Sequence, residues 1–214
     1  MKDFDTIKFD PHACRNELND LKIHLDENDD LNERDDVLSF FRSRRHLSVF
    51  IGSYFTYISD FNRIAYEYDV FGDFKADLVI GDAFSGWYGF IEFENADSSS
   101  IFATKHGKAT PEWSPRFEHG FSQLVDWFWK LSDMENTRDF ANRFGDDYAG
   151  YEGMLVVGRL NGMARRERDR FRWRRDNMLV NSKHVHCVTF DELHDHLDAR
   201  LRSYEAAYQA EQQN

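Results

Sequence analysis

Three acidic residues, Asp77, Glu92 and Glu94, are the part of this chain best suited to chemistry. Asp77 begins the apolar run Asp77-Leu-Val-Ile-Gly81, and the two glutamates lie in Trp87-Tyr-Gly-Phe-Ile-Glu92-Phe-Glu94-Asn95. Two strands joined by the short turn between these runs would bring Asp77 beside Glu92, and strand alternation would give Glu92 and Glu94 a common face. Carboxylates gathered at one end of a sheet suit a hard cation such as Mg²⁺ or Mn²⁺. The spacing predicts the metal site of a phosphodiesterase, although a half-buried strand with one wet face would show the same alternation.

The elements around these carboxylates predict an α/β fold. Helices are expected from Asn32 and over residues 47–55, then strands over 61–71, 74–81 and 87–95, a loop over 96–113, a long helix from Ser114-Pro115 and a short one over 135–144. A strand over 153–160, an Arg-rich helix over 163–180, a strand over 185–189 and a helix opened by the capping box at 189–192 complete the order. The connections between the first three strands are too short for helical crossovers. They therefore predict an antiparallel meander within a mixed β-sheet flanked by helices.

The length favours one large domain with appendages. Residues 1–31 are acidic, with a helix expected over 13–25, and this segment is expected either to pack on the domain or to serve as an interaction arm. Residues 32–205 are expected to form the domain itself, and residues 206–214 a frayed tail.

Composition narrows the class of protein. Apolar residues make up 41% of the 214 residues, which is enough for a buried core. No apolar run approaches the roughly 18 residues of a membrane helix, and the first residues lack the apolar segment of a secretory signal. The only cysteines, Cys14 and Cys187, are far apart in the sequence. Together these features predict a cytoplasmic protein with reduced thiols and no membrane partner.

Charge is unevenly distributed along the chain. The net charge of −12 argues against attraction of the whole surface to nucleic acid. Residues 159–175, however, hold eight arginines against only Glu167 and Asp169. Such a basic stripe is typical of a phosphate-binding surface, and Arg165, Arg166 and Arg172 are our candidates for it. A solvated helix face or a subunit contact would explain the same pattern.

At this point the order of motifs resembles a known family. The spacing Asp-x14-Glu-x-Glu, followed by a helix reading Phe121-Ser-Gln-Leu-Val-Asp-Trp127, resembles the PD-(D/E)xK nuclease superfamily and, more narrowly, the nuclease domain of Shedu anti-phage defence proteins. The strand ending Val157-Gly-Arg159 and the segment Val188-Thr-Phe-Asp-Glu-Leu193 also fit that order. The resemblance covers roughly residues 33–202, and it rests on the order of the motifs, each of which is weakly specific.

The resemblance implies a restriction-endonuclease-like fold and a homo-oligomeric enzyme that hydrolyses DNA with Mg²⁺ (or Mn²⁺). Asp77 and Glu92 would then hold the ion, Glu94 would be a third ligand or a general base, and Gln123 would orient a water molecule or a ligand. Glu33 is a possible extra ligand, although the helix dipole alone would favour an acid in that first turn. Lys105 and Lys108 would contact the DNA backbone unless they belong to a solvated loop.

One position departs from the superfamily pattern, in which a Lys stands two residues after the Glu. Here that residue is Glu94. Lys75 lies two residues before Asp77, so strand alternation would place it on the same face, where it would supply the missing cation. The departure keeps an alternative open: a weak or inactive module on the same fold that binds nucleic acid or protein as a regulator.

Overall fold

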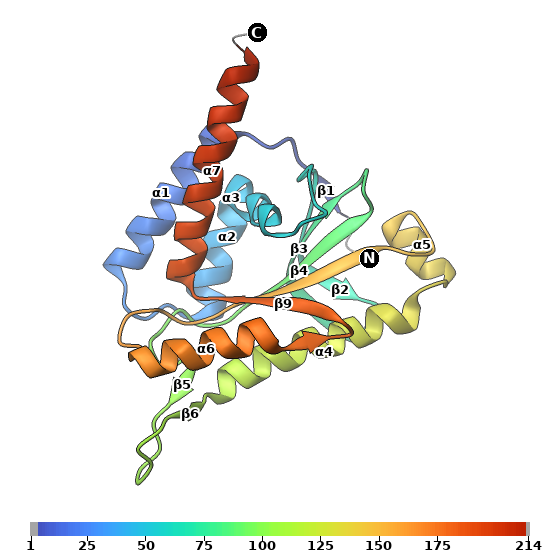
Figure 1. Cartoon of the computed structure of the whole chain (residues 1–214). Helices are drawn as coiled ribbons and strands as arrows, with labels where there is room; N and C mark the ends of the chain where they lie inside the picture. Colours follow the sequence, from blue (N-terminus) through green and yellow to red (C-terminus); the bar gives the residue numbers. More distant parts are fainter. Residues whose placement is uncertain (1–3, 213–214) are drawn as a thin grey trace.

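A seven-stranded sheet with the order β1-β2-β3-β4-β7-β9-β8 organises the computed structural model, which describes residues 4–212 (Figure 1). Its strands are β1 (Asp5–Thr6), β2 (Arg63–Val70), β3 (Phe74–Asp82), β4 (Trp87–Phe93), β7 (Gly150–Val156), β8 (Leu179–Val180) and β9 (Lys183–Val188). A separate two-stranded hairpin contains β5 (Phe102–Ala103) and β6 (Glu112–Trp113).

The sheet is mixed, as the sequence predicts. Strands β1 to β4 pair antiparallel, β4 pairs parallel with β7 and β7 with β9, and β8 returns antiparallel to β9. The parallel pairings follow from the helices that separate β4, β7 and β9 in the chain, because parallel neighbours need a long crossover. The predicted fold, an antiparallel meander extended by further strands and flanked by helices, is confirmed.

Helices cover both faces of the sheet (Figure 1). One face carries α1 (Pro11–Glu27), η1 (Glu33–Leu38), α2 (Ser39–Ser43), α3 (Arg45–Phe50), η2 (Ile51–Tyr54) and α7 (Phe190–Gln212). The other carries α4 (Pro115–Met134), α5 (Arg138–Phe144) and α6 (Arg165–Asn177). Each face therefore has its own apolar core, which we call the α1-side core and the α4-side core.

Several boundaries differ from the prediction. The expected strand over 153–160 begins earlier, at Gly150, and ends at Val156. Gly150 belongs to the strand because it pairs with Trp87 of β4, and only a glycine fits there, since a Cβ atom would come within 2.2 Å of the indole. The loop expected over 96–113 contains β5 and β6, and the strands β1 and β8 were not predicted. Each of these four strands has two residues, which is too short to show an alternation of apolar and polar side chains.

The acidic N-terminal segment packs on the domain, which is the first of the two expected alternatives. Asp10 caps α1 by accepting a hydrogen bond of 2.8 Å from the backbone N–H of His12, and Pro11 occupies the first turn. Four side chains of α1 are buried in the α1-side core: Cys14, Leu18, Leu21 and Leu25. At the other end, α7 continues to Gln212 through the predicted tail, whose last two residues lie outside the described range.

Two expectations drawn from the composition concern the state of the cysteines and the presence of membrane-spanning helices. Cys14 and Cys187 are both buried and neither forms a disulfide. Within residues 4–212, no helix combines the length and the apolar character needed to cross a bilayer.

The packing of α1 gives a direct test. Leu18→Ala should lower the free energy of unfolding by about 3 kcal/mol, since the Leu18 side chain is fully buried and its removal leaves a cavity. Ile23→Ala on the same helix is the control, because Ile23 is 53% exposed and should change stability by less than about 0.5 kcal/mol. Urea unfolding measures both. Equal effects would mean that α1 is not part of the cooperative unit.

Candidate functional site

The three predicted carboxylates meet at one end of the sheet, beneath the first half of α4. The register that pairs Leu78 with Ile91 puts Asp77 opposite Glu92. Asp77 Oδ2 accepts a hydrogen bond of 2.9 Å from the backbone N–H of Phe93. Glu92 is 3% exposed, and Glu94, just after β4, is 1% exposed. The structure thus places a half-buried aspartate and two buried glutamates together.

Asp77 faces this site because the alternation of β3 breaks next to it. Ala76 packs in the α4-side core, whereas Leu78, two residues later, packs in the α1-side core. Glu67, which the register of β2 places opposite Asp77, has a positive φ of 49°, so both strands are irregular at the same level. Residues two apart do not share a face here.

Lys75 is therefore not brought to the carboxylates. Its ammonium lies 3.8 Å from Glu67, which also binds Arg42 of α2 at 2.8 Å on the opposite face of the sheet. The expectation that Lys75 shares the face of Asp77 is wrong, because it assumes regular alternation across the irregular pair of strands.

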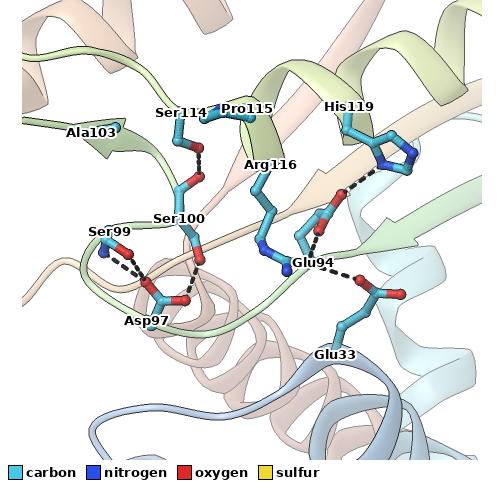
Figure 2. A pocket seen from close by; sticks show the side chains of 10 residues that line it. All are labelled: Glu33, Glu94, Asp97, Ser99, Ser100, Ala103, Ser114, Pro115, Arg116 and His119. Carbon is cyan, nitrogen blue, oxygen red and sulfur yellow. Dashed lines mark hydrogen bonds and ion pairs between the residues drawn. The ribbon is translucent and has the colours of Figure 1, made fainter. Parts of the chain in front are cut away.

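Helix α4 supplies the polar partners of the buried acids. Arg116, His119 and Gln123 follow one another at helical spacing and so lie on one face. The Gln123 amide donates a hydrogen bond to Glu92 Oε1. Arg116 Nη1 lies 2.9 Å from Glu94 Oε2, and His119 Nδ1 lies 3.3 Å from Glu94 Oε1 (Figure 2). Of these three residues, only Gln123 was singled out from the sequence. Its helical spacing to Arg116 and His119 is the signal that would have found them.

Local sequence explains why α4 lies so close. Ser114 caps the helix by accepting a hydrogen bond of 3.0 Å from the N–H of Phe117, and Pro115 fixes its first turn. Gly120 faces the sheet, where a Cβ atom would come within 2.7 Å of Leu155 Cδ1 and 3.0 Å of Glu94 Cγ. A larger residue at position 120 would push the helix and its polar stripe away from Glu94.

Glu33 joins the site from the opposite side. It opens the π-helical turn η1, and its backbone N–H donates a hydrogen bond of 2.9 Å to Asn95 Oδ1. Its carboxylate lies 3.2 Å from Arg116 Nη1, so one guanidinium nitrogen bridges Glu33 and Glu94 (Figure 2). The helix dipole is therefore not the only feature that accounts for an acid at this position.

Burial and crowding raise the pKa values of all three acids. Burial raises the pKa of Asp77 to about 7, and the neighbouring acids Glu33 and Glu94 add to this rise. The pKa of Glu92 is raised well above its usual range by burial and by Asp77 and Glu94. Burial also raises the pKa of Glu94, against the opposing effect of its bonds to Arg116 and His119. A cation close to Asp77 and Glu92 would favour their charged forms.

The donor atoms at Asp77 and Glu92 suit a divalent cation. Glu92 Oε2 is buried and has no hydrogen-bond partner among the described residues, which is unusual for a carboxylate and leaves this oxygen available to a ligand. Glu94, by contrast, has both oxygens engaged by α4. In the described part of the chain, no group of three or more His, Cys, Asp or Glu side chains is arranged to hold a metal ion. Of the three acids, Asp77 and Glu92 are the two that could take an ion without competing with a basic side chain of α4.

A pocket of about 590 Å³ opens beside Glu94 and Arg116 (Figure 2). Its lining residues are Glu33, Glu94, Asp97, Ser99, Ser100, Ala103, Ser114, Pro115, Arg116 and His119. The carboxylate of Asp97 fixes the loop after β4 by accepting hydrogen bonds of 2.7 Å from the hydroxyls of Ser99 and Ser100. The pocket is thus open to solvent on the side of the β5–β6 hairpin and reaches Glu94, whereas Asp77 and Glu92 are not among its lining residues.

The Arg-rich segment divides into two sets. Four arginines hold the fold together: Arg159 pairs with Asp191, Arg170 bonds the Pro111 carbonyl, Arg174 pairs with Glu118, and Arg175 pairs with Glu192. Four others on α6 are exposed: Arg165, Arg166, Arg168 and Arg172. The predicted phosphate-binding residues Arg165, Arg166 and Arg172 all belong to the exposed set.

The two candidate lysines lie on the β5–β6 hairpin, away from α6 in the sequence. Lys105 and Lys108 both pair with Glu112, and these contacts lower the pKa of Glu112 to about 2. Their ammonium groups are therefore already partly neutralised within the hairpin.

The chain was compared with models of known protein families. The family model described as Shedu protein SduA, C-terminal, matches residues 30–194. This stretch includes Glu33, the three central carboxylates, all of α4 and all of α6. A comparison with curated proteins gave no match.

The raised pKa of Asp77 predicts a pH-dependent stability. Between the ordinary pKa of 3.8 and the raised value of about 7, the folded state binds more protons than the unfolded state. The free energy of unfolding should therefore fall as the pH rises through this window. Asp77→Asn, which mimics the protonated acid, should be more stable than wild type at pH 8 by on the order of 2 kcal/mol, because one pK unit corresponds to about 1.4 kcal/mol.

Urea unfolding at pH 4 and pH 8, without divalent ions, measures this effect. Asp126→Asn on the exposed face of α4 is the control and should keep the wild-type pH dependence. The assignment fails if Asp77→Asn loses as much stability with rising pH as wild type does.

Proposed function

The chain belongs to the family described as Shedu protein SduA, C-terminal, and from this premise we propose that it is a metal-dependent DNA endonuclease of bacterial anti-phage defence. The observation that carries the proposal is the pair Asp77 and Glu92. These acids lie on adjacent antiparallel strands, and Glu92 has a buried oxygen that no described residue hydrogen-bonds. The same arrangement on a mixed sheet supports placing the chain in the PD-(D/E)xK superfamily.

Asp77 and Glu92 would hold Mg²⁺ or Mn²⁺. When bound, such an ion polarises a phosphate and lowers the pKa of a coordinated water molecule. The chain's own residues position the reactants. Gln123, which already bonds Glu92, holds that carboxylate in one orientation, and α4 covers the acids from bulk water.

DNA would approach along the exposed arginines of α6. Arg170 lies over the rings of Phe102 and Trp113, which fixes α6 against the β5–β6 hairpin that borders the pocket. The exposed Arg165, Arg166 and Arg172 therefore lie on an element joined to the border of the site. Arginine at such positions suits contact with phosphates of the DNA backbone. Lys105 and Lys108 would contribute less, because Glu112 neutralises them.

Homo-oligomer formation is also part of the proposal. Apolar side chains that remain exposed on α4, Val125 and Trp129, would serve as a subunit contact.

A second candidate, a regulatory module without catalysis, is favoured by one observation. Arg116 forms an ion pair with Glu94, and His119 lies within 3.3 Å of it, so the third acid of the site already has partners that are not a metal. Such a protein would bind DNA, or another protein, and leave DNA uncut.

Plasmid cleavage distinguishes the two candidates. Wild type should cut supercoiled plasmid with Mg²⁺ or Mn²⁺ and not with EDTA, and Glu92→Gln should reduce the rate by at least about a hundredfold, since it removes an ion-binding charge. Glu152→Gln is the matched control, because Glu152 is also a partly buried strand glutamate but pairs with His186. DNA binding by wild type without cleavage under any condition would instead support the regulatory module.

The DNA-binding surface has its own test. The triple variant Arg165→Gln, Arg166→Gln, Arg172→Gln should bind DNA more weakly, and the slope of log affinity against log salt should fall by about 0.9 for each DNA phosphate that the variant no longer neutralises. Arg42→Gln, Arg44→Gln, Arg45→Gln removes the same charge from α2 and α3, on the other face of the sheet, and is the control. Fluorescence anisotropy at several salt concentrations measures both. An equal weakening of DNA binding in the two triple variants would contradict a specific role for α6.

A further inference from the structure

Glu94 is bound by α4 in a way that differs from Asp77 and Glu92. Its Oε2 accepts from Arg116 at 2.9 Å, and its Oε1 lies 3.3 Å from His119. Glu92, by contrast, has one oxygen that forms no hydrogen bond within residues 4–212. Two neighbouring glutamates at one strand end thus have different partners: one is open to an ion, and the other holds two basic side chains.

The contact between Glu94 and α4 is built into the packing. Glu94 is 1% exposed, and the missing side chain of Gly120 leaves the space that its Cγ occupies. An ion held by Asp77 and Glu92 would compete with Arg116 and His119 for the oxygens of Glu94. If Glu94 left them, Arg116 would keep its contact with Glu33 and His119 its contact with Gln123.

Arg116 is well placed to contact an anionic ligand. Among the described residues, its hydrogen bonds and ion pairs all use Nη1, which contacts Glu94 and Glu33. The donors on Nε and Nη2 remain available, and the side chain is 40% exposed at the pocket (Figure 2). A guanidinium anchored at one nitrogen and free at the others presents an ordered fork of donors, which suits a phosphate.

We propose that Glu94 is a positioning residue that anchors Arg116 at the edge of the site, and that Arg116 is the cationic group that contacts the DNA phosphate there. Glu94 is then not a metal ligand. Glu94 on the strand end holds an arginine of α4. This arginine provides the positive charge that position 94 lacks and that Lys75, on the other face of the sheet, does not supply. Glu33 is the second anchor of the same guanidinium. The inference rests on the proposed nuclease function.

Mn²⁺ affinity, measured by calorimetry with the metal alone, separates a ligand from an anchor. Glu92→Gln should weaken Mn²⁺ binding by more than about tenfold, whereas Glu94→Gln and Arg116→Gln should leave it within about threefold of wild type. Both of the latter variants should nevertheless slow plasmid cleavage by about a hundredfold. Arg116→Lys should recover part of that rate, because it restores the charge without the fork.

A combined variant tests the anchoring itself. If Glu94 acts through Arg116, the double variant Glu94→Gln, Arg116→Gln should cleave no more slowly than either single variant, because the two residues work as a unit. Placing the cation directly on the strand, in Glu94→Lys with Arg116→Gln, should restore cleavage above that of Arg116→Gln alone. Arg45→Gln is the matched control, since Arg45 is 43% exposed and forms an ion pair of 3.0 Å with Asp5 far from the site.

The outcomes distinguish the inference from the function on which it rests. Loss of Mn²⁺ binding in Glu94→Gln to the extent seen in Glu92→Gln would identify Glu94 as a ligand and overturn the inference, with the nuclease function intact. Normal cleavage by Arg116→Gln would overturn it as well. A wild-type protein that neither binds Mn²⁺ nor cuts DNA would overturn the proposed function and the inference with it.

Discussion

Burial of several carboxylates at one end of the sheet is the constraint on which the rest of this structure depends. A buried charge without a partner is costly, and acids placed side by side raise the cost further. The chain offsets it with one helix face, from which Arg116, His119 and Gln123 reach the acids. That face is effective only while α4 lies close to the strands, so Gly120 and the fixed start of the helix at Ser114-Pro115 serve the site as much as the fold.

The position of α4 is in turn fixed by aromatic packing with arginines. The ring of Trp113 stacks on Phe117 at a centroid distance of 4.9 Å and so ties the β5–β6 hairpin to the first turn of the helix. The guanidinium of Arg174, from α6, lies 4.7 Å from both rings and pairs with Glu118 of α4. Half of the basic segment therefore stabilises the wall of the site, and only the other half faces solvent. This division explains why a strongly basic helix can belong to an acidic protein without being wholly a nucleic-acid surface.

Sequence reasoning succeeded where the local pattern determines the geometry. The tight connections predicted the meander, and the spacing of Asp77 and Glu92 predicted that they would lie side by side. It failed for Lys75, because the irregular pair of strands at Asp77 and Glu67 reverses the face and leaves no mark in the apolar pattern. The sequence also could not divide the arginines into those that hold the fold together and those that are exposed. Only tertiary contacts distinguish Arg174, which lies over aromatic rings, from the exposed Arg172.

Placing an acid where the superfamily pattern has a lysine changes how such a site would be controlled. A lysine on the strand would be positioned by the strand alone, so the position of its charge would not depend on the packing of a second element. Arg116 reaches the site only while α4 is packed and its contact with Glu94 is kept, so the position of its charge depends on the tertiary structure. A small displacement of α4, by a partner subunit or by DNA lying along α6, would move this cation and leave the Asp77–Glu92 pair in place on the sheet. In the proposed nuclease, the acid at position 94 would thus separate the residues that hold the ion from the residue that contacts the phosphate, and the position of the second would depend on helix packing.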